Sequence, residues 1–600
     1  MAHTLPTRSQ VDPANTWAIT DLYPSDQAWR EAYDSVRGLV SSLAEYRGRL
    51  AESAATLLAF LRLQDEIELQ GDRVISYAFR KSDEDTRNAV YQEMSAQSQN
   101  LLVELSQALS FQTPELLAIE DAALEAFYAQ EPALAHYRLM LSRIRSRKDH
   151  TLSPDGEALL ASAERMGQAP DDIFSLLNDA DMTYPDAVDG KGEAHPVTHG
   201  NYVALLQSAD RTLRESAFRS LYGVYGQFRN TCAAILGAQM KQLQFFADAR
   251  RYPSALHAAL AETEVDPQIY HNLIQTVHDN LGAMHRYVRL RKKLLGVDKL
   301  HYYDLYTPIV ADEDAGIPFE QAKDMAREAL VPLGEDYLKI LNEGFDNRWI
   351  DVYENQGKRS GAYSAGVYGV HPYVLLNYTD TLDDVFTLVH EMGHALHSYL
   401  SNRTQSVTYA GYKIFVAEVA STCNEALLMQ HLLSRTTEPK RRAYLINHFL
   451  EQFRGTLYRQ TMFAEFELWC SEQTRKGRPL TAEALNEKYA QLNALYYGED
   501  IEPDPEIALE WARIPHFYYN FYVYQYATGF ASAIALSQRI LKEGRPAVED
   551  YLRFLSGGCS ADPVSLLRGA GVDISTPAPI VDALKLFDTL IGEIEELMKP

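Results

Sequence analysis

An H-E-x-x-H motif, formed by His390, Glu391 and His394, has the residue types and the spacing of a metal site for hydrolysis. On an α-helix, histidines four residues apart leave the same face, so their two imidazoles can bind one metal ion. The glutamate between them is turned aside and can act as a general base on a metal-activated water. Chance alone gives on the order of 0.03 such matches in a chain of this size and histidine content, so the motif is informative.

The motif can work only on a helix, and the residues around it favour one. Thr381 can cap a helix N-terminus, with Asp384 completing a capping box. The following residues are almost all apolar and no proline interrupts them, which predicts a buried helix over residues 381–402. The alternative is a buried helix whose two histidines bond to backbone carbonyls. His397, seven residues after His390, is interpreted as a packing or orienting residue.

Two histidines leave a catalytic metal one protein ligand short, because such sites usually have three. A second predicted helix, over residues 412–433, carries Glu418 within the apolar sequence FVAEVA. A carboxylate in such surroundings is costly unless it is paired or bound to a metal. Glu425, seven residues on, shares the helix face and is the rival ligand. We favour Glu418 as the third ligand and Glu425 as a partner that orients a histidine, and the donor set suits one zinc ion per chain.

Composition and charge exclude several classes of function. The 600 residues carry 82 acidic and 56 basic side chains, so the net charge is -26. Such a charge opposes nucleic-acid binding, which needs a basic surface, and weakly favours basic or neutral substrates. Four cysteines without metal-like spacing indicate no disulfide framework. The N-terminal sequence lacks the apolar run of a signal peptide and no stretch is long enough to span a membrane, so the expected location is the cytoplasm.

Helical periodicity dominates the chain and predicts a mainly α fold. The periodicity loosens over residues 182–208, where glycine and proline are frequent, which places a boundary near residue 200. Residues 349–378 are rich in Gly, Tyr and Val and predict a small β-sheet. This sheet would come directly before the predicted helix over residues 381–402 that carries the motif, which we call the metal helix. Within the sheet, residues 361–367 could form an exposed edge strand that pairs with a peptide backbone. An ordinary hairpin fits that segment equally well.

An unusual aromatic stretch, IPHFYYNFYVYQYATGF over residues 514–530, holds five tyrosines after His516. The simplest interpretation is an aromatic packing helix, but hydroxyl groups at this density need partners if they are buried. On a helix, Tyr519 and Tyr526 would share a face, with Tyr522 between them. A tyrosine or histidine aimed at the metal could stabilise the oxyanion that forms when water attacks a carbonyl.

Together, these blocks resemble the oligoendopeptidase F family, within the zinc oligopeptidase group that includes thimet oligopeptidase. The similarity extends over nearly the whole chain. It rests on the opening TWAITDLYPSDQAW, the helix LVHEMGHALH, the segment FVAEVASTCNEALL, and the C-terminal blocks IPHFYYNFYVYQYATGF and LLRGAGVD.

The resemblance implies a large, multi-lobed helical body that encloses a deep channel, with the small sheet next to the zinc helix. Residues 1–200 would be an N-terminal helical region covering the channel, and residues 201–600 the catalytic region. Only short unstructured peptides would enter, and the chain would act as a monomer or a small homo-oligomer.

The resemblance also assigns roles to individual residues. Glu391 would be the general base, and His516 with a tyrosine would polarise the scissile carbonyl; Tyr519 and Tyr526 are favoured over Tyr522. The implied zinc ligands are His390, His394 and Glu418.

The expected function is therefore zinc-dependent endoproteolysis of short oligopeptides. The alternative enzyme is a zinc carboxypeptidase or dipeptidyl carboxypeptidase on a similar helical body, which needs a cation to hold the substrate's terminal carboxylate. Lys358 and Arg359 could supply that cation. The alternative from another class is a helical binding or scaffold protein with a vestigial metal site, which the intact motif disfavours.

Overall fold

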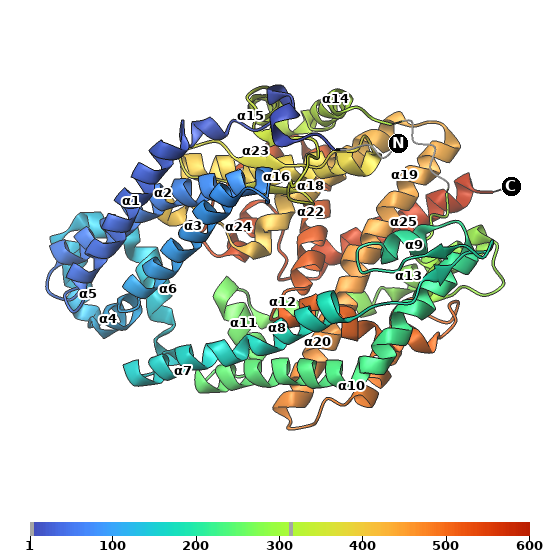
Figure 1. The fold of residues 1–600 in the computed structure, drawn as a ribbon, viewed down its shortest axis with the longest axis horizontal. Helices are drawn as coiled ribbons and strands as arrows, with labels where there is room; N and C mark the ends of the chain where they lie inside the picture. The colour runs from blue at the N-terminus through green and yellow to red at the C-terminus, as the bar shows by residue number, and fades with distance from the viewer. Residues whose placement is uncertain (1–4, 311–315, 600) are drawn as a thin grey trace. The chain divides into compact units, whose positions relative to one another are not determined.

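The prediction of a mainly α fold is confirmed by the computed structural model, which describes residues 5–310 and 316–599 (Figure 1). Helices make up 72% of the structure and strands only 2%. Among the described residues, none of the helices combines the length and the apolar character needed to cross a bilayer.

The chain forms two compact units, each built from three separate segments. Unit 1 contains residues 1–151, 314–428 and 536–571, and unit 2 contains residues 152–313, 429–535 and 572–600. The candidate metal ligands all belong to unit 1, whereas His516 and the neighbouring tyrosines belong to unit 2. The functional division near residue 200 remains a prediction, because compactness alone does not assign function to either segment.

Unit 1 is helical apart from one small sheet. Two helices, α18 and α22, begin in one unit and end in the other. The elements of unit 1 are α1 (Asp26–Ser42), α2 (Ala54–Glu84), α3 (Ala89–Ala108), α4 (Gln112–Ala118), α5 (Asp121–Gln130), α6 (Arg138–Ser146), α14 (Phe319–Ala329), α15 (Gly334–Asp346), β3 (Ile350–Asp351), β4 (Tyr363–Ala365), β5 (Tyr373–Leu375), α16 (Leu382–Thr404), α17 (Val407–Ala410), α18 (Ile414–Arg435), α23 (Arg545–Leu555) and α24 (Pro563–Gly569).

Unit 2 contains the 39-residue helix α10 and a two-stranded hairpin. Its elements are α7 (Pro154–Gly167), α8 (Ala169–Leu176), β1 (Ala187–Val188), β2 (Ala194–His195), α9 (Tyr202–Gln207), α10 (Arg211–Ala249), α11 (Ala255–Thr263), α12 (Pro267–His278), α13 (Leu281–Leu295), α19 (Pro439–Gln452), α20 (Arg459–Arg475), α21 (Ala482–Tyr497), α22 (Tyr524–Glu543) and α25 (Ala578–Leu597).

The small sheet of unit 1 leads the chain into the metal helix, as the sequence predicted. Its strand order is β3-β5-β4, with β3 parallel and β4 antiparallel to the central strand. Central strand β5 is fully buried, as its apolar sequence Tyr373–Leu375 requires, and only six residues separate it from α16. The strand β4 lies at an edge of the described sheet and contacts α16.

The first three helices of unit 1 pack side by side and form much of its apolar core. Trp29 of α1 is buried against α2, where its indole N–H donates to the carbonyl of Val74 at 2.8 Å. The same core extends to Val367, Tyr373 and Leu375 around the sheet. The N-terminal helices therefore share one core with the segment that precedes the metal helix, although 250 residues or more separate them in sequence.

Candidate active site

The helix α16 forms for the local reasons that its sequence suggested. The Thr381 hydroxyl accepts from the Asp384 backbone N–H at 3.1 Å, and the Asp384 carboxylate accepts from the Thr381 N–H at 3.0 Å. This reciprocal capping box satisfies two backbone groups at the helix start. The helix extends from Leu382 to Thr404, and most of its apolar residues are fully buried. It is therefore a rigid support for the histidines near its middle.

Close packing brings α18 against α16. A Cβ atom placed on Gly393 would lie 2.6 Å from the Cα of Ser421 and 2.9 Å from the carbonyl oxygen of Ala420, both on α18. Real side chains essentially never make contacts this short, so only glycine permits the two backbones to approach so closely at this point. The Asn424 side-chain amide also donates to the Val389 carbonyl at 3.3 Å.

His390, His394 and Glu418 converge as the sequence predicted. Their potential ligand atoms all lie within 4.8 Å of one another. The Oε2 atom of Glu418 is 3.4 Å from Nε2 of His390 and 3.4 Å from Nε2 of His394. The Ser421 hydroxyl donates to the same oxygen at 3.2 Å. The arrangement has one carboxylate oxygen facing two imidazole nitrogens, all of them partly accessible.

Glu425 takes the orienting position rather than the position facing both histidines. Its Oε1 accepts from Nδ1 of His390 at 2.5 Å. This contact fixes the ring and leaves Nε2 directed toward Glu418. A carboxylate on the far nitrogen of a ligand histidine sets its tautomer and makes it a better donor to a metal.

The charges around the cluster favour a cation at its centre. Burial would lower the pKa of His390, but its contacts with Glu418 and Glu425 outweigh burial and raise the pKa to about 10. Burial would raise the pKa of Glu418, yet hydrogen bonds from His390 and His394 hold it well below the usual range. A bound metal ion can supply the positive charge that a proton on an imidazole otherwise provides.

Glu391, unlike Glu418 and Glu425, makes no hydrogen bond to the described residues through its buried Oε2. The residue is only 7% exposed. Burial raises its pKa, and the nearby histidines offset part of that rise. A buried carboxylate with a raised pKa, beside the two histidines of the motif and with no hydrogen bond to the described residues at Oε2, is a candidate for proton transfer.

The structure places His397 in the packing role that we expected. It is 1% exposed, and its ring stacks on Tyr412 with centroids 3.7 Å apart. Burial and the neighbouring His394 lower its pKa to about 3, so the ring is neutral. The Tyr412 hydroxyl is 2.9 Å from the Ser398 hydroxyl.

The donor set of the cluster fits a catalytic zinc ion. Two imidazole nitrogens and one carboxylate oxygen are the protein ligands that many catalytic zinc sites use, with positions left for water and substrate. The second nitrogen of His390 is already occupied by Glu425, so its tautomer suits metal binding. The unpartnered oxygen of Glu391 nearby suits a group that handles protons.

In unit 2, the aromatic stretch differs from the single helix that we expected. Residues 515–518 form a short 3-10 helix, and α22 begins only at Tyr524. Between them, Asn520 and Phe521 have φ angles of 52° and 58°, a left-handed conformation that ends any right-handed helix. Tyr519 and Tyr526 therefore do not share a helix face.

Both tyrosines nevertheless contact His516. Ring centroids lie 5.5 Å apart for His516 and Tyr519, and 5.7 Å apart for His516 and Tyr526. The Tyr526 hydroxyl is within 3.3 Å of Nε2 of His516. Tyr519 is 49% exposed, and Tyr522 packs edge-on against Tyr526. Burial and the charge of Arg459 lower the pKa of His516, which favours the neutral imidazole.

Two residues that shape these clusters were not predicted from the sequence. Gly393 lies inside the motif, and a glycine in a buried helix signals close approach of another backbone. Glu467 of α20 is fully buried and accepts from the Phe521 N–H at 2.7 Å. It therefore supports the left-handed turn after His516, and no short-range pattern in the sequence connects residues so far apart.

Comparison with known proteins identifies the family. The model for peptidase family M3 matches residues 204–586, and the model for oligopeptidase F matches residues 115–184. The chain is 45% identical to oligopeptidase PepF of Bacillus subtilis, over its full length and 89% of that protein. It is 39% identical to group B oligopeptidase PepB of Streptococcus agalactiae, over 98% of each chain.

Solved structures agree with these matches. A putative peptidase from Chlamydophila abortus superposes with a TM-score of 0.92 at 35% identity, over 99% of this chain and 100% of that one. Oligoendopeptidase-F from Enterococcus faecium superposes with a TM-score of 0.76 at 39% identity, over 96% of this chain and 99% of that one. The chain therefore belongs to peptidase family M3 and is a metallopeptidase of oligopeptides.

Proposed function

We propose that the chain is a zinc-dependent endopeptidase that cleaves internal bonds of short, unstructured oligopeptides. His390, His394 and Glu418 would hold one zinc ion. The observation that carries the proposal is the convergence of two helix-borne imidazoles and one carboxylate within 4.8 Å, next to an unpartnered buried glutamate.

The chain's own residues can perform the proton transfers. A bound zinc ion supplies Lewis-acid chemistry, which makes a water more acidic and a carbonyl more electrophilic. Glu391 takes a proton from the attacking water at its carboxylate and later passes it to the leaving amine. His516 and Tyr526, with Tyr519 as a further donor, would give hydrogen bonds to the oxyanion of the tetrahedral intermediate.

The edge strand β4 suits binding of a peptide backbone. It occupies the edge position in the order β3-β5-β4, and it contacts the helix that carries His390 and His394. A substrate strand added there would be held by main-chain hydrogen bonds that do not depend on side-chain identity. This feature supports hydrolysis of peptides with varied sequences.

Lys358, one of the two cations considered for an exopeptidase, is already paired with Asp351 inside the protein. The Lys358 side chain is fully buried, 2.7 Å from the Asp351 carboxylate, and it also donates to the carbonyls of Tyr353 and Leu376. It cannot hold a substrate carboxylate without leaving a buried charge unpaired. Arg359 is more exposed and pairs with Asp83 at 3.4 Å. These contacts favour the endopeptidase over an enzyme that depends on both cations.

The test uses the full-length protein and a quenched peptide blocked at both ends. Internal cleavage that a chelator such as phenanthroline abolishes, and that added zinc restores, is the expected result. Cleavage only of peptides with a free C-terminus would instead identify an exopeptidase. Peptide binding without any hydrolysis, unaffected by the chelator, would identify a binding protein.

A further inference from the structure

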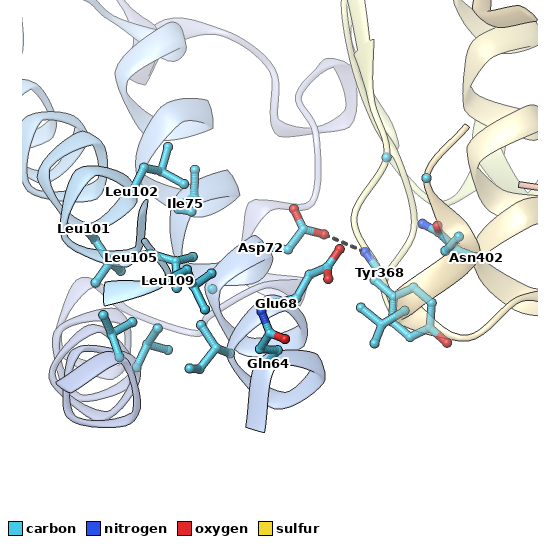
Figure 2. Close-up of a pocket in the computed structure, with 18 of the residues that line it drawn as sticks. Gln64, Glu68, Asp72, Ile75, Leu101, Leu102, Leu105, Leu109, Tyr368 and Asn402 are labelled. Atoms are coloured by element: carbon cyan, nitrogen blue, oxygen red, sulfur yellow. Dashed lines mark hydrogen bonds between the residues drawn. The ribbon is translucent and has the colours of Figure 1, made fainter. Parts of the chain in front are cut away.

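A second feature of unit 1 is a cavity of about 580 Å³ beside the C-terminal half of α16. Its lining comes from α1, α2, α3, α16 and α17, together with residues that follow α3, β4 and α17 (Figure 2). All of these residues belong to unit 1. A cavity of this size lies within the range of small-ligand sites and could hold one or two side chains of a peptide.

One wall of the cavity is apolar and partly uncovered. Leu101, Leu102 and Leu105 of α3 line it together with Ile75 of α2 (Figure 2). The Leu102 side chain is 43% exposed, and covering its apolar surface would be favourable in free energy. This wall is suited to the aliphatic part of a ligand.

The part of the cavity next to Tyr368 is acidic (Figure 2). Glu68 and Asp72 of α2 are the only charged side chains among the described residues that line the cavity. Asp72 already accepts from the Tyr368 backbone N–H at 2.8 Å, as Figure 2 shows, and a more distant hydroxyl, that of Ser76, faces it at 3.4 Å. Asp65, one turn before Glu68, accepts from Tyr137 and Thr408 outside the cavity.

Glu68 differs from both neighbouring carboxylates because no described residue gives it a hydrogen bond or an ion pair. Its side chain is exposed and lies beside Asp72 and Gln64 in the cavity (Figure 2). Partial loss of solvent within the cavity, together with the charges of Asp65 and Asp72, raises its pKa to about 7. A carboxylate close to two others attracts a cation, and the leucines of α3 that line the same cavity suit the aliphatic stem of one.

The helix α16 connects this cavity with the metal cluster. Ser398 and Asn402 line the cavity, four and eight residues after His394. At about 1.5 Å of rise per residue, they lie roughly 6 and 12 Å further along the helix axis. An extended peptide rises about 3.3 Å per residue, so this span corresponds to about two to four substrate residues from the cleaved bond.

The strand β4 indicates which end of the peptide reaches the cavity. The chain leaves β4 at Ala365 and directly enters the cavity lining at Gly366 and Tyr368. Antiparallel pairs are more common than parallel ones. A peptide paired antiparallel to β4 would have its N-terminal part at this end of the strand.

We propose that this cavity is a substrate subsite for a cationic group located two to four residues before the cleaved bond. The group is a lysine or arginine side chain, or the free α-amino group of a short peptide. Its charge would lie at Glu68 and its aliphatic part on the leucines of α3. The inference rests on the proposed function, since it concerns the same peptide substrates.

The experiment compares kcat/KM for blocked quenched peptides that differ at one position. Lysine, norleucine or glutamate is placed two, three or four residues before the cleaved bond, and the same set is made after that bond. We expect wild type to prefer lysine over norleucine by about tenfold at one position before the bond. Glu68→Gln should abolish this preference, chiefly by lowering kcat/KM for the lysine peptide, and Glu68→Lys should favour glutamate.

The matched control is Glu66→Gln, which removes the same charge from the opposite, exposed face of α2. It should retain the preference of wild type.

Because Glu68 must be ionised to hold a cation, the preference of wild type should increase as pH rises from 6 to 8. This increase should be absent in Glu68→Gln. A free N-terminus tested against an acetylated one at the same position distinguishes the α-amino group from a side chain.

Several outcomes would overturn the subsite. These are an unchanged preference in Glu68→Gln, an equal loss for lysine and norleucine peptides, or a preference only after the cleaved bond. In each case, normal chelator-sensitive cleavage of the norleucine peptide would show that the peptidase proposal stands. If wild type cleaves none of the peptides, the proposed function itself is contradicted.

Discussion

Among single residues, the three glutamates around His390 and His394 differ in their contacts. Glu418 faces both histidines, Glu425 holds the far nitrogen of His390, and Oε2 of Glu391 makes no hydrogen bond to the described residues. The three carboxylates lie close together but differ in what they contact. Their substitution should therefore separate metal binding from proton transfer.

The first prediction concerns Glu391→Gln. The amide cannot take a proton from water, whereas the ligands of the cluster remain intact. We expect zinc content to stay at one ion per chain and kcat to fall by several orders of magnitude. Zinc analysis and the quenched-peptide assay measure the two effects. A variant that cleaves at nearly the rate of wild type would contradict the role of Glu391 as base.

The second prediction compares Glu418→Ala with Glu425→Gln. Loss of Glu418 removes a ligand, so the protein should lose its zinc during dialysis. Glu425→Gln leaves an acceptor for Nδ1 of His390 but removes its charge, and metal affinity should fall by about 10- to 100-fold. Competition with a fluorescent chelator measures both affinities. Retention of stoichiometric zinc by Glu418→Ala would reverse the two assignments.

At the scale of elements, the distance between α16 and α18 decides whether the cluster exists. The histidines and Glu418 come from different helices, and their approach depends on the absence of a side chain at Gly393. The motif thus supplies both histidines and also the close contact that brings Glu418 to them.

The third prediction is that Gly393→Ala separates these two helices. The added methyl group would collide with the backbone of α18, which has no flexible side chain there to move aside. We expect weaker zinc binding and a lower unfolding temperature. The control is Gly38→Ala in α1, where a Cβ meets nothing within 4 Å and helix propensity should raise stability slightly. Equal behaviour of the two variants would contradict the role of close packing.

At the scale of the whole molecule, unit 2 contains a buried carboxylate that links stability to pH. Burial raises the pKa of Glu467 to about 8, although the N–H of Phe521 lowers it in part. In the unfolded chain the same group ionises near its ordinary value of 4.5. Between these two values the folded protein holds a proton that the unfolded chain releases, so stability falls as pH rises.

The fourth prediction follows from this difference. The free energy of unfolding of wild type should decrease from about pH 5 to pH 8 relative to Glu467→Gln, because the amide does not titrate and can still accept from Phe521. Denaturant unfolding at several pH values measures the difference. Glu487→Gln, an exposed substitution on α21 with the same loss of charge, should follow wild type. Parallel pH profiles for wild type and Glu467→Gln would contradict the prediction.

Local patterns predicted the capping box at Thr381, the helix around the motif and the small sheet before it, because caps and periodicity act over a few residues. The aromatic stretch was predicted wrongly as one helix. Its left-handed turn at Asn520 and Phe521 depends on a hydrogen bond to Glu467, which lies more than 50 residues earlier in the chain.

The types and spacing of His390, Glu391 and His394 restrict what a helix can present on one face, so the candidate metal-binding motif is recognisable from local sequence. Which glutamate faces both histidines, and which contacts the far nitrogen of His390, depends on how α16 and α18 pack. In the same way, the acidic cavity beside α16 exists because the distant helices α2 and α3 pack near it. The physical reason is that both outcomes depend on how closely separate helices pack, and packing joins residues whose separation in sequence carries no periodic signal.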